Sequence, residues 1–184
     1  PRAHRAGYGP IAHVDLAAGA AHLAHGADTF TGFSHVLGSS GGDTISGDAG
    51  GNRLDGGAGN DTISGRAGDD VIAGGAGANY LRGDDGDDSV FGGSGFDDIN
   101  GNKGDDVIDG GSGGADWLVG GQGHDLITAH ASGNILYGNL GNDTLDGGDG
   151  ADQVRGGQGD DVVNGGAGND YVSGDRGNDT ITGG

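Results

Sequence analysis

The sequence lacks several residues on which common functional sites depend, because its 184 residues include no cysteine, no glutamate and no methionine. Without cysteine, the chain can form neither a disulfide framework nor a thiolate metal site. Without glutamate, the HExxH motif of zinc proteases is impossible, and no cysteine nucleophile is available. We therefore expect no enzyme activity here, so that any catalytic domain would lie outside this chain.

Long hydrophobic runs and positive charge are also scarce. No apolar stretch approaches the roughly 20 residues that cross a membrane. Only 8 lysines and arginines face 28 acidic residues, which leaves a net charge of −20. This balance makes nucleic acid an unfavourable partner and predicts strong self-repulsion unless cations bind. Because the chain begins at Pro1 and contains no methionine, we also expect it to be part of a longer product.

Glycine and aspartate dominate what is present. The chain has 49 glycines, and all 28 acidic residues are aspartate. Solubility alone does not explain this preference, since either carboxylate would serve. Aspartate holds its carboxylate close to the backbone, where it can combine with turn carbonyls around a hard cation.

A nine-residue repeat runs from Gly38 to Thr182 in sixteen copies, with one inserted residue between Gly110 and Val119. Glycine occupies positions 1 and 4 in fifteen copies. Position 8 is aliphatic in every copy, which a disordered glycine-rich chain has no reason to maintain. The position-8 residues are Ile45, Leu54, Ile63, Ile72, Leu81, Val90, Ile99, Ile108, Leu118, Ile127, Leu136, Leu145, Val154, Val163, Val172 and Ile181.

This pattern predicts an all-β solenoid. Each copy would form a turn of six residues and a strand of three, with position 8 facing inward and positions 7 and 9 facing solvent. Two copies would make one flattened coil with strands on opposite sheets, giving about eight coils stacked about 4.8 Å apart. We expect residues 1–37 to form an irregular N-terminal linker and capping coil, and residues 38–184 to form the repeat domain.

Position 6 supplies the candidate metal ligands. A core one aliphatic residue thick per strand is too thin to offset the ordering of so many glycines, so an outside contribution is needed. Alternate copies share an edge, so the position-6 side chains would form two columns of carboxylates. An all-oxygen shell of carboxylates and turn carbonyls favours Ca²⁺ over Zn²⁺ or Mg²⁺. The candidate ligands are Asp43, Asp61, Asp70, Asp88, Asp97, Asp106, Asp116, Asp125, Asp143, Asp152, Asp161, Asp170 and Asp179.

The two columns are predicted to be unequal. One runs from Asp70 to Asp179 without interruption, whereas the other is interrupted by Asn79 and Asn134, and Asn52 precedes Asp70. Asparagine lacks the charge of aspartate. Sites that touch these three asparagines should therefore be weaker or empty.

The copies GGAGNDTIS, GGQGDDVVN and GGAGNDYVS resemble the haemolysin-type calcium-binding nonapeptides, or RTX repeats, with consensus GGxGxDxUx. The resemblance implies a right-handed parallel β-roll in which each Ca²⁺ bridges one turn and the next on the same edge. It also implies a secreted, extracellular protein, exported by type I secretion, that folds on meeting calcium. Sites near the turn at 129–132 and near Gly113 and Gly114 depart from the pattern, which puts calcium binding there in doubt.

Two functional classes remain open. The chain could be a calcium-dependent folding and secretion module attached to an effector, or a structural rod in an adhesin, surface layer or virion fibre. An ice-binding threonine face is weakly supported because Thr44, Thr62, Thr144 and Thr180 are scattered. The presence of an effector elsewhere in the full-length protein would separate the two main classes.

Two further features lie outside the calcium pattern. His4, His13 and His22 are nine residues apart, so a stacked imidazole site for a transition metal is conceivable. The outward positions Trp117, Val119, Ile135 and Tyr137 fall on neighbouring same-face strands. They predict an exposed apolar patch for a protein partner or for self-association.

Overall fold

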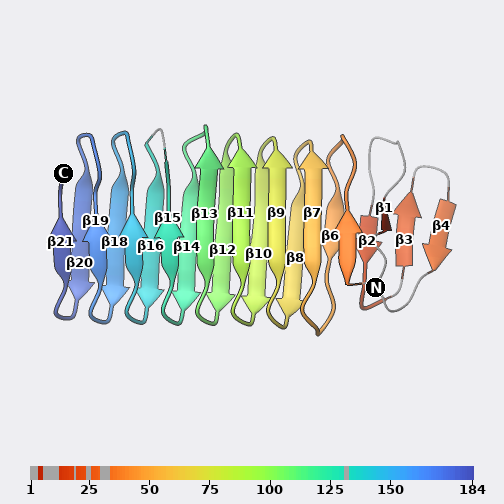
Figure 1. Ribbon diagram of the computed structural model, residues 1–184, viewed down its shortest axis with the longest axis horizontal. Coiled ribbons are helices and arrows are strands. Elements are labelled where there is room, and N and C mark those ends of the chain that lie inside the picture. The colour runs from red at the N-terminus through yellow and green to blue at the C-terminus, as the bar shows by residue number, and fades with distance from the viewer. Residues whose placement is uncertain (1–3, 6–12, 19, 24–25, 30–33, 131–132) are drawn as a thin grey trace.

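The computed structural model describes residues 4–5, 13–18, 20–23, 26–29, 34–130 and 133–184, and it is an all-β solenoid (Figure 1). The described residues contain no helix, and so none that is long and apolar enough to cross a membrane. The coils stack along one long axis, with turns along two opposite edges (Figure 1). The predicted fold class is therefore confirmed.

Two sheets form the walls of the solenoid, and we call them sheet A and sheet B. Sheet A has the order β1-β5-β7-β9-β11-β13-β15-β17-β19-β21, all parallel. Its strands are β1 (His4–Arg5), β5 (His35–Leu37), β7 (Arg53–Ala58), β9 (Val71–Ala76), β11 (Ser89–Ser94), β13 (Val107–Ser112), β15 (Leu126–Thr128), β17 (Thr144–Asp146), β19 (Val162–Asn164) and β21 (Thr180–Thr182).

Sheet B has the order β20-β18-β16-β14-β12-β10-β8-β6-β2-β3-β4 and is parallel from β20 to β2. Its strands are β2 (His13–Asp15), β3 (Ala20–Leu23), β4 (Gly26–Thr29), β6 (Thr44–Ser46), β8 (Thr62–Ala67), β10 (Asn79–Asp85), β12 (Asp97–Lys103), β14 (Trp117–Gln122), β16 (Ile135–Leu140), β18 (Gln153–Gln158) and β20 (Tyr171–Arg176). Successive copies of the repeat alternate between the two sheets, as the nine-residue period predicts.

The core is the single layer of position-8 side chains between the sheets. From Ile45 to Val163 each of these side chains is at most 1% exposed. Val14 and Val36 extend the layer toward the N-terminus. At the other end Ile181, in β21, is 50% exposed. The core is therefore as thin as the sequence indicates.

Many strands are longer than the predicted three residues. β7, for example, continues from position 7 through position 3 of the next copy, and its register with β9 omits only Gly56. Glycine at position 2 permits this, because Gly57 and Gly75 have φ of 96° and 95° and still pair across the two coils. In the copies with six-residue strands, the first half of the apparent turn therefore belongs to the sheet.

The inserted residue is absorbed in one turn. Gly113 and Gly114 both have positive φ, 89° and 74°. Beyond them the pairing resumes with Asp98 opposite Trp117 and Ile99 opposite Leu118. Later coils keep the same register, so the insertion does not shift the core.

The N-terminal strands differ from the repeat. β2 lies parallel to β6, whereas β3 and β4 add to sheet B in antiparallel orientation. His13 lies opposite His22 across β2 and β3, but His4 lies on sheet A opposite Val36. The hypothesis of three stacked histidines is therefore wrong, because the backbone places His4 on the other sheet. The boundary at residue 37 stays a prediction.

Candidate metal centre

The position-6 residues lie along the two edges of the solenoid, as predicted. Each lies at the end of a turn, either just before a strand or, for Asn79 and Asp97, as its first residue. Column 1 precedes the strands of sheet A and contains Asn52, Asp70, Asp88, Asp106, Asp125, Asp143, Asp161 and Asp179. Column 2 precedes those of sheet B and contains Asp43, Asp61, Asn79, Asp97, Asp116, Asn134, Asp152 and Asp170. From Asp43 to Asp161 these side chains are at most 5% exposed, so they are buried rather than displayed at the surface.

One oxygen of each carboxylate holds the coils together. The backbone N–H of Asp70 donates to Oδ1 of Asp88 at 2.8 Å, and that of Asp88 donates to Oδ1 of Asp106 at 2.9 Å. The same bond repeats down both columns, and across the insertion Asp97 donates to Asp116 at 2.9 Å. Sequence reasoning missed this ladder, because the repeat pattern does not reveal which backbone group a side chain accepts from.

The second oxygen is buried and has no partner. Oδ2 forms no hydrogen bond at Asp61, Asp70, Asp88, Asp97, Asp106, Asp125, Asp143, Asp152, Asp161 and Asp170. A buried acceptor without a partner costs about 1–3 kcal/mol, and more when it is charged. Ten such oxygens at one repeat position indicate a group that the protein atoms do not supply.

The glycine at position 1 leaves space beside that oxygen. A Cβ placed on Gly92 would lie 2.5 Å from Oδ2 of Asp97 and 2.5 Å from the carbonyl oxygen of Gly110. Gly83 shows the same arrangement with Asp88 and with the carbonyl of Gly101. A carboxylate oxygen and a carbonyl oxygen from the next coil thus approach one point, and only glycine leaves it open.

Burial shifts the pKa of these carboxyl groups. The loss of water around them, with the negative charge of neighbouring aspartates, outweighs the hydrogen bond from the preceding coil. The pKa rises to about 7 for Asp88, Asp106 and Asp125, and to about 6 for Asp61, Asp70, Asp116 and Asp143. The pKa values of Asp97, Asp152 and Asp161 are also raised. A bound cation would oppose this shift.

At two asparagine turns, the side-chain amide nitrogen has a hydrogen-bond acceptor within the protein. Nδ2 of Asn79 lies toward Gly74, where Oδ2 of an aspartate lies in other turns, and donates to the carbonyl of Gly77 at 3.5 Å. Nδ2 of Asn134 donates to Oδ1 of Asp152 at 3.2 Å. An amide nitrogen cannot ligate a hard cation, so these turns lack the unpartnered oxygen of the others.

The carboxylates do not converge as a compact cluster. Within the described ranges, no three histidine, cysteine or acidic side chains come together to hold a metal ion. Each turn contributes one carboxylate, and backbone carbonyls must complete any shell. Such a donor set, all oxygen and spread over two turns, fits Ca²⁺, which takes six to eight oxygen ligands including carbonyls. The residues present therefore fit calcium.

A second ladder, at position 5, was not predicted. On the edge of column 1 the N–H of Asp105 donates to Oδ1 of Asp87 at 2.8 Å, and His124 donates to Asp105 at 2.7 Å. These bonds run in the opposite direction to those of position 6. The position-5 side chains are exposed, so they have water as a partner and lack the unmet oxygen that marks position 6.

Comparison with known proteins agrees with this geometry. The family model of the RTX calcium-binding nonapeptide repeat matches residues 37–72, 64–99, 82–113, 91–127, 111–145 and 146–181. No curated protein matches the chain. Because these matches cover most of the chain, and because the repeats form the parallel solenoid described above, this protein belongs to the RTX calcium-binding nonapeptide repeat family.

Proposed function

We propose that this chain is a calcium-dependent folding module of a larger secreted protein, largely unstructured without calcium and folded into the β-roll when calcium binds. The thirteen position-6 aspartates, from Asp43 to Asp179, would supply the carboxylate ligands. The observation that carries the proposal is the row of buried Oδ2 atoms without partners. Calcium would supply the positive charge that these oxygens lack.

The energetics support coupled folding. The net stability of a typical domain is about 5–15 kcal/mol, and each unmet buried acceptor costs about 1–3 kcal/mol. Ten unmet oxygens can therefore cancel the stability of a domain whose core is one side chain thick. A ligand that binds only the folded state restores this stability by mass action.

A role in secretion follows from the same property. Members of this family are typically secreted bacterial proteins. A chain that stays unfolded until it meets calcium could pass an export channel unfolded and fold outside the cell. We therefore place this module in a secreted or cell-surface protein, and we assign it no catalytic role.

Far-ultraviolet circular dichroism tests the folding proposal. In EDTA we expect a largely unstructured spectrum, and in millimolar Ca²⁺ a β-rich one. Mg²⁺ at the same concentration serves as the control, because it keeps its waters and prefers near-ideal octahedral sites. A native β spectrum in EDTA would show that the thin core suffices alone and would overturn the proposal.

A role in protein contact is a second candidate, and it rests on the apolar patch of sheet B. Trp117 lies opposite Ile135 and Val119 opposite Tyr137, as predicted. The patch is smaller than predicted, because only Trp117 is exposed, at 45%, while the other three residues are half-buried against their neighbours. Replacing Trp117 and Tyr137 by serine should leave calcium-induced folding intact and weaken association in sedimentation measurements. Unchanged sedimentation of an associating protein would exclude the patch.

A further inference from the structure

The outer face of sheet B carries polar side chains at a position where most copies of sheet A have glycine. At position 2 the sheet A copies have Gly57, Gly75, Gly93, Gly111, Gly148 and Gly166, all with positive φ. The corresponding residues after the strands of sheet B include Arg66, Asp84, Asn102, Asn139 and Asp175, also with positive φ. Asparagine and aspartate tolerate a left-handed backbone better than other non-glycine residues, whereas Arg66 is strained by it.

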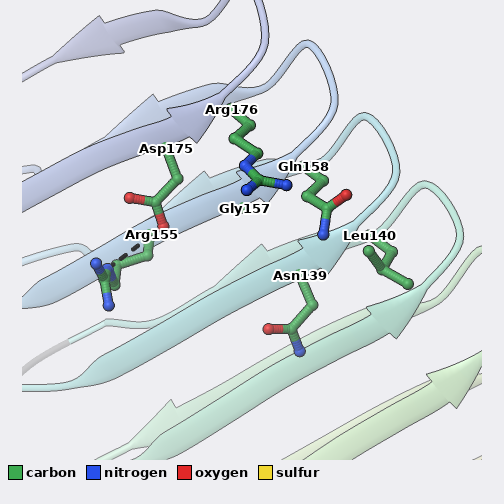
Figure 2. A pocket seen from close by; sticks show the side chains of 7 residues that line it. All are labelled: Asn139, Leu140, Arg155, Gly157, Gln158, Asp175 and Arg176. Carbon is green, nitrogen blue, oxygen red and sulfur yellow. Dashed lines mark ion pairs between the residues drawn. The ribbon is translucent and has the colours of Figure 1, made fainter.

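At the C-terminal end of sheet B, this row surrounds a hollow. Gly157 lies between Asn139 and Asp175 in the ladder of β16, β18 and β20, and it adds no side chain to the row. The hollow has a volume of about 630 Å³ and is lined by Asn139, Leu140, Arg155, Gly157, Gln158, Asp175 and Arg176 (Figure 2). A smaller hollow of about 260 Å³ adjoins it and adds Tyr137 to the lining.

The charges in the hollow are unusual for this protein. Two arginines and one aspartate line it, which leaves one surplus positive charge within a chain of net charge −20. Elsewhere on sheet B, Arg66, Arg82 and Lys103 each have an acidic partner within 2.9 Å. The hollow is therefore a local site at which an anion is favoured electrostatically.

Both arginines have unused donors. Nε of Arg155 lies 3.5 Å from Oδ2 of Asp175, and it is buried without a hydrogen bond. Asp175 in turn accepts a hydrogen bond from Ser173 Oγ at 2.6 Å, so its charge is shared. The Arg176 side chain reaches from β20 toward Gln158 on β18 and forms no ion pair or hydrogen bond with any described residue (Figure 2).

The remaining lining specifies the ligand further. The amides of Asn139 and Gln158 can each donate and accept, which suits hydroxyl groups, and they have no partner among the described side chains. Tyr137 and Leu140 add apolar surface. A guanidinium fork matches the geometry of a carboxylate, and one surplus positive charge matches a monoanion.

We propose that this hollow binds a monocarboxylate with neighbouring hydroxyl groups, of the size of a sugar acid, with the guanidinium groups of Arg155 and Arg176 contacting the carboxylate. This site is independent of the calcium columns, because none of its lining side chains belongs to them. It also lies on the face of sheet B, whereas the columns lie along the edges.

Isothermal titration calorimetry on the calcium-saturated chain tests the proposal, with glucuronate as the probe. We expect glucuronate to bind, glucose of the same ring size to bind at least about tenfold more weakly because it lacks the carboxylate, and acetate to bind more weakly because it lacks the hydroxyls. Equal binding of glucose, or of acetate or inorganic phosphate, would overturn the assigned chemistry. Undetectable binding of millimolar glucuronate would overturn the site.

Matched variants separate this site from the folding function. Arg176→Gln and Arg155→Gln should each weaken glucuronate binding about tenfold or more, whereas Arg53→Gln, an exposed position on sheet A, should not. All three variants should fold with calcium as the unaltered chain does, which circular dichroism checks independently. Unchanged binding by both hollow variants would overturn the proposal even if calcium-dependent folding is confirmed.

Discussion

Nδ2 of Asn79 donates to the carbonyl oxygen of Gly77, 3.5 Å away within the same turn, in the place where an aspartate would hold an unpartnered oxygen. This turn therefore stabilises itself without a cation. The aspartate turns around it do not. The difference between the two kinds of turn leads directly to the first prediction.

Asn79→Asp should create a calcium site. The new carboxylate can still accept the N–H of Asp61 through Oδ1, as Asn79 does at 3.0 Å, and its other oxygen would be unpartnered. We expect more Ca²⁺ bound per chain by calorimetry. Asn169→Asp adds the same charge at an exposed position and should leave the number of bound ions unchanged. Unaltered stoichiometry in Asn79→Asp would contradict the role given to the aspartates.

Asp106→Asn should weaken calcium-induced folding. Asp106 lies in the middle of column 1, and its Oδ2 is buried and unpartnered. We expect the loss of one charged ligand to cost about 1.5–3 kcal/mol of binding free energy, which corresponds to calcium binding about 10–100-fold weaker at the adjoining sites. The calcium concentration at half-maximal circular dichroism measures the effect. The control is Asp105→Asn, at the exposed position next to Asp106. The new asparagine keeps an oxygen that accepts the N–H of His124, so the calcium midpoint should stay within about twofold of that of the unaltered chain. Equal shifts in the two variants would show that only overall charge matters.

Gly92→Ala should block one site by filling it. A Cβ there would lie 2.5 Å from both Oδ2 of Asp97 and the carbonyl oxygen of Gly110, so the turn must move. We expect a loss of about 1–3 kcal/mol in calcium and fewer ions bound. Gly183→Ala makes the same change where no atom lies within 4 Å, and it should have no effect. Denaturant unfolding at saturating Ca²⁺ compares the stability of the two variants. A Gly92→Ala variant as stable as the unaltered chain would show that the space beside Oδ2 of Asp97 is not a calcium site.

Acidification should stabilise the calcium-free fold. Burial raises the pKa of Asp88, Asp106 and Asp125 to about 7, above the ordinary value of 3.8. An acid whose pKa is raised in the folded state binds its proton more tightly there than in the unfolded chain. Its contribution to the free energy of unfolding is therefore complete below the ordinary pKa and is lost as the pH rises through about 7. In EDTA, β structure should therefore increase as the pH falls from 8 toward 5. A decrease over that range would contradict the assigned burial.

Calcium binding should depend on pH in the opposite sense. Protons and Ca²⁺ compete for the same carboxylates, so the calcium midpoint should rise as the pH falls from about 8 to 5. Asp106→Asn removes one of the titrating groups and should make the dependence shallower. A midpoint independent of pH would indicate that the carboxylates are not ligands.

The periodic part of the structure was predictable because each copy solves the same physical problem. An aliphatic residue such as Ile63 or Leu81 every nine residues can be buried only by stacking on other copies, which determines the two sheets, the core and the two aspartate columns. Asp61 and Asp70 lie on opposite edges because they belong to successive copies. These features depend only on spacing, so the sequence alone determines them.

The remaining features depend on backbone conformation that spacing does not reveal. The strands are longer than predicted because glycines such as Gly57 adopt positive φ and still join the ladder. The sequence also does not predict that the position-6 carboxylates are buried or that they accept a hydrogen bond from the backbone of the preceding coil, because residue type alone does not indicate the partner of a side chain. The hollow at Gly157 requires knowledge of which strands lie beside β18. His4 was misplaced because the N-terminal strands do not follow the nine-residue period.

Neighbouring coils are related by eighteen residues, and their hydrogen bonds point along the long axis of the solenoid. Tension applied to the two ends would therefore load the bonds of one terminal coil at a time rather than the whole sheet. Each coil that detaches would release about 60 Å of chain. Force spectroscopy should record a series of small, evenly spaced events instead of one large rupture, and their height should increase with calcium. The repeat would thus extend gradually under load and lengthen in steps while the coils beyond the break stay folded.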